Sequence, residues 1–152
     1  MDNPVQIKLE QQQDFQFAVH FDNPQIPVLL TDEPAPLGSG QGPSPEQMLA
    51  VAVANCLSAS LLFAMRKFKN DPSPIRTSAT IRTSRNAQNR VRISAVSVDV
   101  TLGVPAASIT MLERILGQFE DFCVVTQSVR TAIPVTVRVL DAEGALLHTS
   151  GA

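Results

Sequence analysis

The sequence of 152 residues contains no tryptophan and no tyrosine, and its aromatic side chains are seven phenylalanines. Basic residues are also few. The 12 lysines and arginines are outnumbered by 14 aspartates and glutamates, which gives a formal charge of −2. Nucleic-acid-binding proteins need a basic surface and often stacking rings, so we expect no nucleic-acid partner. Charged residues make up 17% of the chain, below the roughly 25% of soluble domains, which predicts surface buried between subunits.

No basic segment followed by an apolar run opens the chain, so the sequence predicts no secretory signal and a cytoplasmic protein. The length fits a single domain, residues 1–152. Only two cysteines occur, Cys56 and Cys123. In a reducing compartment such a pair is more often catalytic, redox-active or simply buried than a permanent disulfide.

Three common kinds of site lack their motifs. The glycines between residues 38 and 42 precede a helix start, but no Gly-Lys-Ser/Thr follows, and Pro43 and Pro45 remove amide donors that would hold a phosphate. His20 and His148 have no metal-ligand spacing with the cysteines, and the serine hydrolase motif G-x-S-x-G is absent. We therefore expect no nucleotide, no metal and no cofactor.

Apolar and polar residues alternate near the start of the chain, which predicts short antiparallel strands over residues 5–9, 14–21 and 26–31. Proline and glycine then alternate too densely for a regular element, so residues 31–43 are predicted to form a long loop.

A long helix is the strongest prediction. Ser44 and Gln47 form a capping-box pattern around Pro45, and Asp71-Pro72 ends the helical pattern. The run from Met48 to Met65 is apolar on nearly all sides, and a membrane span is one interpretation. Because asparagine and serine interrupt the run and no second span exists, we favour no membrane and a central helix between a sheet and another helix.

Period-two alternation returns over residues 75–82 and 91–102, which predicts a hairpin of two long strands. The apolar positions of the second strand change parity after Ala95, which indicates a bulge or a switch of buried face.

An amphipathic helix is predicted after this hairpin, because these residues share one stripe: Ile109, Leu112, Ile115, Leu116, Phe119 and Phe122. A short helix or turn over 124–130 and a strand over 133–139 follow. Strands, helix, strands, helix and strand in this order predict an α+β fold.

Taken alone, a cysteine among alanines and leucines is more often an inert small hydrophobe than a nucleophile. The surroundings of the two cysteines favour chemistry, however. Residues 42–49 (GPSPEQML) contain Glu46, which lies ten residues before the first cysteine, and residues 122–129 (FCVVTQSV) surround the second. Together with residues 31–38 upstream, these segments resemble the OsmC/Ohr family of osmotically inducible and organic hydroperoxide resistance proteins. The resemblance covers residues 15–140.

The resemblance implies an intertwined homodimer with antiparallel sheets around a long central helix and two active sites at the subunit interface. It also implies reduction of small organic hydroperoxides. Cys56 would be the peroxidatic nucleophile, Cys123 the resolving thiol and Glu46 the acid of the site. The oxidised pair would be reset by an external dithiol, such as a lipoylated protein.

Two features complicate this assignment. Ten helical residues rise about 15 Å, so Glu46 cannot touch Cys56 of its own straight helix and must serve another chain or bend back. Peroxidases of the family carry an arginine in the N-terminal strands, whereas the first arginine here is Arg66. Compensation would come from Lys8, from a histidine, or from a partner subunit.

The histidine that would supply the missing positive charge is His20. The partner subunit would supply it from Arg82 or Arg92, which lie on predicted strands. Without such a cation, a buried thiol is pushed toward its neutral form. Two alternatives to a peroxidase therefore stay open. One is a noncatalytic OsmC-like protein that binds a small apolar ligand in the interface cavity, and the other is a dimer with a purely structural role.

Overall fold

The structure, a computed structural model, describes residues 3 to 151 and has the expected α+β fold. The chain divides into an N-terminal unit that ends at Met48 and a C-terminal unit that begins at Leu49.

The N-terminal unit contains a three-stranded antiparallel sheet in the order β1-β2-β3. Its strands are β1 (Ile7–Gln11), β2 (Phe17–Phe21) and β3 (Leu29–Thr31). The meander is confirmed, but β2 begins three residues later than predicted. Asp14 has a φ of 53° within the turn that joins β1 to β2, and the left-handed region does not fit a strand.

Helix α1 (Pro45–Lys67) begins as predicted. The Ser44 backbone N–H donates to Gln47 Oε1 at 2.9 Å, and the Gln47 N–H donates to Ser44 Oγ at 3.3 Å, which completes the capping box. The chain leaves the helix at Lys69, whose φ is 62°, and the Asn70 N–H bonds back to the Met65 carbonyl.

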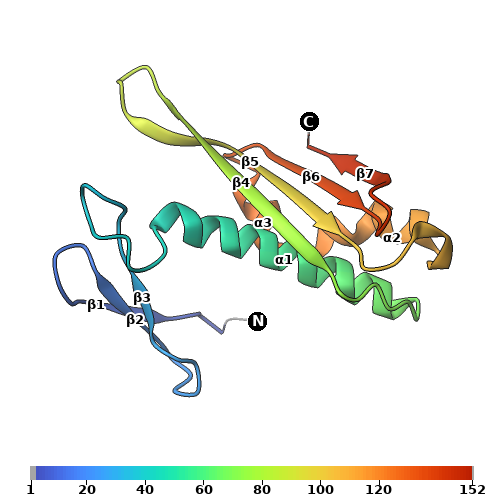
Figure 1. Cartoon of the computed structure of the whole chain (residues 1–152), viewed down its shortest axis with the longest axis horizontal. Coiled ribbons are helices and arrows are strands. Elements are labelled where there is room, and N and C mark those ends of the chain that lie inside the picture. Colours follow the sequence, from blue (N-terminus) through green and yellow to red (C-terminus); the bar gives the residue numbers. More distant parts are fainter. Residues whose placement is uncertain (1–2, 152) are drawn as a thin grey trace. The chain divides into compact units, whose positions relative to one another are not determined.

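The C-terminal unit is built on a four-stranded sheet in the order β4-β5-β6-β7, and α1 runs alongside it (Figure 1). The strands are β4 (Arg76–Arg85), β5 (Val91–Thr101), β6 (Val135–Leu140) and β7 (Leu146–Ser150). The β4/β5 and β6/β7 pairs are antiparallel, whereas β5 and β6 are parallel.

The predicted bulge in the second long strand is confirmed. Thr83 pairs with Ile93 while Arg82 pairs with Ala95, so Ser94 is the extra residue in β5. The insertion puts both Ile93 and Val96 on the side of the sheet that packs into the core. This accounts for the change of parity along the strand.

The helical segments after β5 differ from the prediction. A continuous amphipathic helix was expected to reach Phe122, but the chain forms η1 (Ala106–Ser108), α2 (Leu112–Gln118) and the tight 3-10 turn η2 (Phe119–Phe122). Because the winding changes at η2, Phe122 leaves the buried stripe and is 66% exposed, and Cys123 enters the core in its place.

The short helix predicted next is confirmed as α3 (Val124–Val129), and β6 follows. The β7 strand was not predicted, because Leu146 to Ser150 form an edge strand without a clear alternation of apolar and polar residues.

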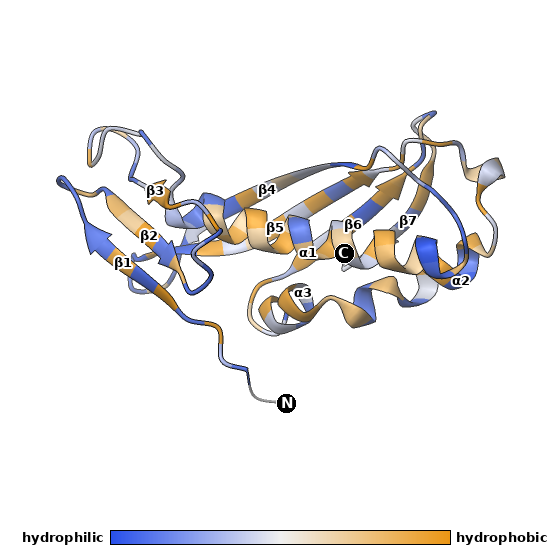
Figure 2. Ribbon diagram, turned by 90° about the horizontal axis from the view of Figure 1, so that it is seen from below, coloured by the Kyte–Doolittle hydropathy of each residue, from blue (hydrophilic) through white to orange (hydrophobic). Residues whose placement is uncertain are grey.

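One hydrophobic cluster joins α1, α2, η2 and the sheet in the C-terminal unit. Its fully buried members include Val53, Leu57, Leu61, Val98, Ile115, Phe119, Val137 and Val139. Helix α1 is hydrophobic along most of its length (Figure 2), yet only one face reaches this cluster. The opposite face is exposed within the single chain, so the prediction of a helix covered on both sides holds for one side only.

By length and composition alone, α1 would also be able to cross a membrane. A single such helix is weak evidence, because core helices of soluble proteins meet the same criterion.

Candidate functional site

Cys56 lies in the middle of α1, one residue before the fully buried Leu57. Its side chain is partly buried and packs against the hydrophobic cluster of the C-terminal unit. The thiol is not part of a disulfide. Cys56 therefore lies at the edge of the core, where a small reactant has a shorter path to the sulfur than it has to a fully buried group.

Cys123 lies at the junction between η2 and α3 and is 0% exposed. Its backbone N–H donates to the Glu120 carbonyl at 3.0 Å, and its own carbonyl accepts the Gln127 N–H at 2.9 Å. Its thiol donates to Thr126 Oγ1 at 3.0 Å, and Thr126 is also 0% exposed. The sulfur is thus held in place on both the backbone and the side-chain side.

The two cysteines are neighbours in one hydrophobic cluster, although 66 residues separate them in the sequence. The pKa of the Cys123 thiol is raised, first by burial and then by a hydrogen bond with the Cys56 thiol, while hydrogen bonds with Thr126 oppose the rise. A pair of neighbouring free thiols is the arrangement that a disulfide-forming reaction needs.

Glu120, three residues before Cys123, was not singled out from the sequence. Its side chain is 11% exposed and accepts hydrogen bonds from Arg130 Nη2 at 2.9 Å and from Ser150 Oγ at 2.7 Å. The second carboxylate oxygen lies 2.7 Å from His148 Nε2. Burial raises the pKa of this carboxyl, but the hydrogen bonds outweigh it, and the net pKa is lowered.

These contacts tie the turn that carries Cys123 to the edge strand β7. His148 also packs edge-on against the Phe119 ring, with 5.7 Å between the ring centroids. No local pattern predicted this cluster, because its members are up to 30 residues apart and β7 itself was not predicted.

The family model for OsmC-like protein matches residues 38–138, which is about two thirds of the sequence and includes both cysteines. The chain belongs to the OsmC-like family. No curated protein matches it.

Solved structures have the same fold as this OsmC-like chain. An OsmC-like protein of unknown function from Vibrio cholerae is 14% identical with a TM-score of 0.75, and the match covers 91% of this chain and 100% of that one. The organic hydroperoxide resistance protein OhrB of Bacillus subtilis is also 14% identical, with a TM-score of 0.67 and coverages of 90% and 98%.

An organic hydroperoxide resistance protein from Elizabethkingia anophelis is 16% identical, with a TM-score of 0.68. That match covers 91% of this OsmC-like chain and 98% of the relative. At these identities the comparison bears on the fold and not on the chemistry.

The other residues expected in the site of the OsmC-like chain are accessible. Glu46 is exposed in the first turn of α1, ten residues before Cys56 along one continuous helix. The cations considered as replacements for the missing N-terminal arginine are exposed as well, namely Lys8, His20, Arg82 and Arg92. The role of Glu46 and the source of a cation stay predictions, because both depend on a second chain.

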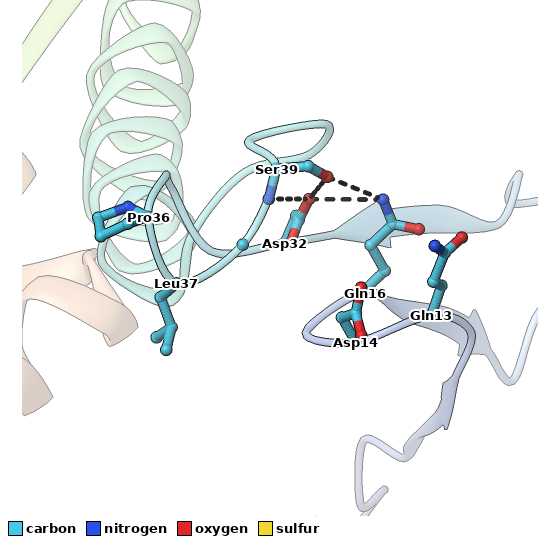
Figure 3. A pocket seen from close by; sticks show the side chains of 8 residues that line it. Gln13, Asp14, Gln16, Asp32, Pro36, Leu37 and Ser39 are labelled. Carbon is cyan, nitrogen blue, oxygen red and sulfur yellow. Dashed lines mark hydrogen bonds between the residues drawn. The ribbon is translucent and has the colours of Figure 1, made fainter.

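A second buried carboxylate was also missed, this time in the N-terminal unit of the OsmC-like chain. Asp32 is 2% exposed at the end of β3, and Ser39 Oγ donates to its Oδ2 at 2.8 Å (Figure 3). The backbone N–H groups of Glu33 and Gln41 donate to it at 2.8 and 3.0 Å, and the pKa of Asp32 is lowered to about 2.

This carboxylate holds the proline- and glycine-rich loop that the sequence left without structure. A cavity of about 330 Å³ lies beside it, lined by polar side chains such as Gln13, Gln16 and Ser39. A Cβ atom on Gly38 would collide with the Glu33 carbonyl and with the Asp32 carboxylate. Only glycine allows the backbone at position 38 to come this close to Asp32 and Glu33, so Gly38 is the residue of the sequence that indicates this packing.

Proposed function

We propose that this OsmC-like protein is a thiol-dependent peroxidase that reduces organic hydroperoxides through Cys56 and Cys123. The observation that carries the proposal is the proximity of two free thiols in one hydrophobic cluster, one at the edge of the core and the other fully buried. The names of the Bacillus and Elizabethkingia proteins, which refer to organic hydroperoxide resistance, support the choice of substrate class.

The reaction balances with these two sulfurs and one external dithiol. The Cys56 thiolate attacks the distal oxygen of the hydroperoxide, the O–O bond breaks, and the alcohol leaves after the alkoxide takes a proton. Cys56 is then a sulfenic acid, and the Cys123 thiol displaces its hydroxyl as water to form the disulfide. The dithiol returns two electrons and becomes a disulfide itself.

The difference in exposure between the two thiols supports the proposed assignment of their roles. A hydroperoxide must reach the nucleophile along the O–O axis, which favours the partly exposed Cys56. Cys123 needs to reach only Cys56, and complete burial protects its thiol from oxidation by bulk peroxide. Early disulfide formation also protects Cys56 from irreversible over-oxidation.

The proposal includes a homodimer in which Glu46 serves the site of the partner. Support comes from an exposed stripe on α1, which repeats every four residues from Val51, 59% exposed, to Phe63, 69% exposed. Residues at this spacing lie on one helix face. The stripe consists of Val51, Asn55, Ala59 and Phe63, and the exposed apolar side chains at its two ends are the ones that a partner subunit would cover.

A steady-state assay with tert-butyl hydroperoxide and dihydrolipoamide tests the proposal. Wild-type protein should consume peroxide, Cys56→Ser should not, and Cys123→Ser should stop at a sulfenic acid that dimedone labels on Cys56. Ser60→Ala, a small change in the same helix, is the matched control. Sedimentation of the same samples should give twice the chain mass of 16.4 kDa. Peroxide consumption by Cys56→Ser at the wild-type rate would contradict the proposal.

A second candidate is a noncatalytic protein that binds a small apolar ligand. An apolar pocket of about 310 Å³ in the N-terminal unit favours it, and its lining includes Ile7, Leu9, Val19, Phe21 and Met48. Pockets of this size and character suit small hydrophobic molecules. Native mass spectrometry that finds a retained ligand, together with no peroxide consumption by wild-type protein, would support this candidate instead.

A further inference from the structure

The two sulfurs of the pair differ in a way that bears on how their disulfide is reduced. Cys123 and Thr126 are both 0% exposed, and the Cys123 thiol donates to Thr126 Oγ1 at 3.0 Å. A hydroxyl both accepts and donates hydrogen bonds, so the same Thr126 oxygen can donate to Cys123 once that sulfur becomes a thiolate. Cys56 is the partly exposed member of the pair.

We propose that the reductant attacks Cys56 of the oxidised pair, that Cys123 is the leaving group, and that Thr126 is a positioning residue that stabilises the departing Cys123 thiolate. The inference deepens the proposed function, since it rests on a Cys56–Cys123 disulfide as the oxidised form. The class of reductant is a small dithiol.

The step is balanced as follows. One thiolate of the dithiol bonds to Cys56 Sγ, the protein disulfide breaks, and its electron pair goes to Cys123 Sγ, which then takes a proton. The second thiol of the reductant loses its proton and attacks the reductant sulfur already bound to Cys56. A cyclic disulfide is released together with the Cys56 thiolate, so the reductant is oxidised by two electrons and the protein is reduced by two.

Access and leaving-group stability point to the same sulfur. Thiol–disulfide exchange needs approach to the attacked sulfur, which full burial of Cys123 denies, and it is faster when the leaving thiol has a lower pKa. Burial raises the pKa of Cys123 and would by itself make that sulfur a poor leaving group. The hydrogen bonds of the Thr126 side chain and backbone act in the opposite direction, so loss of the hydroxyl removes part of what opposes the effect of burial.

The first experiment compares Thr126→Val, which keeps the shape of the side chain and removes the hydroxyl, with Thr126→Ser, which keeps the hydroxyl. The disulfide is formed with diamide, and its reduction by dithiothreitol is followed by quenching and mass spectrometry. We expect reduction of Thr126→Val to be about fivefold slower than that of wild type, the equivalent of one hydrogen bond of about 1 kcal/mol. Thr126→Ser should restore the rate.

Thr131→Val is the matched control, because Thr131 is exposed and its hydroxyl bonds only the Ser128 carbonyl. Its reduction should proceed at the wild-type rate. In a Cys56→Ser background, thiolate absorbance at varied pH should show a higher Cys123 pKa in Thr126→Val than in Thr126→Ser. Equal reduction rates for Thr126→Val and wild type, or a Thr126→Ser variant as slow as Thr126→Val, would overturn the role of Thr126.

A second experiment locates the point of attack. The diamide-made disulfide is treated with 2-mercaptoethanol, a monothiol that cannot complete the second step, and the adduct is mapped by peptide mass spectrometry. An adduct on Cys56 is the expected result, and an adduct on Cys123 overturns the inference. Because no hydroperoxide is used, a protein that passes both experiments but fails to react with hydroperoxide would refute only the proposed function. A failure of diamide to join the two cysteines would overturn the inference itself.

Discussion

Asp32 in the N-terminal unit and Glu120 in the C-terminal unit are both buried carboxylates, and both hold irregular segments, but their donors differ. Asp32 is held by neutral groups, mainly backbone N–H groups and a serine hydroxyl within nine residues of it. Glu120 is held by an arginine, a histidine and a serine that lie 10 to 30 residues further along the chain.

This difference separates two ways of using a buried carboxylate. The network of Asp32 shapes one loop and reaches beyond it to Gln16, just before β2, so it stays within the N-terminal unit. The network of Glu120 fastens the turn before Cys123 to β7, and so it joins distant parts of the C-terminal unit. Removal of Glu120 should therefore lower the stability of the whole unit, whereas removal of Asp32 should loosen a single segment.

The largest effect is expected for Glu120→Gln. The substitution keeps the shape but leaves the partly buried Arg130 guanidinium without an anionic partner, so the free energy of unfolding should fall by about 2 to 3 kcal/mol. Urea denaturation followed by circular dichroism measures it. Asp121→Asn, at the exposed neighbouring position, is the control and should stay within about 0.5 kcal/mol of wild type. A Glu120→Gln protein as stable as this control would contradict the comparison.

The same contrast between local and long-range contacts explains which features of the structure could be predicted from the sequence. Features encoded by neighbouring residues were predicted, such as the Ser44 capping box and the bulge near Ala95. The proximity of the two cysteines was expected only from the family resemblance, because 66 residues separate them. The periodic apolar stripe after residue 109 was interpreted as one helix, since no residue near Phe119–Phe122 indicates the tight turn there.

The Glu120 network could not be predicted from the sequence, for a related reason. The network depends on the pairing of β7 with β6 in a register that places His148 opposite Val139. An edge strand with little alternation of apolar and polar residues does not allow that register to be predicted. The Asp32 network could in principle have been predicted, since most of its donors are close in sequence and Gly38 allows their approach.

A smaller and local effect is expected for Asp32→Asn. An amide group placed among N–H donors leaves at least one of them without an acceptor, so hydrogen exchange of the Ser39 and Gln41 amides should accelerate about tenfold. Exchange in β4 to β7 should not change. Asp22→Asn, at an exposed position of the same unit, is the control. Faster exchange throughout the C-terminal unit of Asp32→Asn would refute the view that this network is local.

The smallest effect is the response of the Asp32 loop to moderate acid. Its folded pKa of about 2 lies below the ordinary value of 3.8, so the ionised carboxylate contributes its full stabilisation above pH 3.8 and loses it as the pH falls through about 2. The carboxyl carbon resonance of Asp32 should therefore be nearly constant between pH 7 and pH 4, and the Gln41 amide resonance should move with it at lower pH. A titration midpoint near 3.8 would mean that the neutral donors do not hold the charge, and the distinction between the two carboxylates would lose its basis.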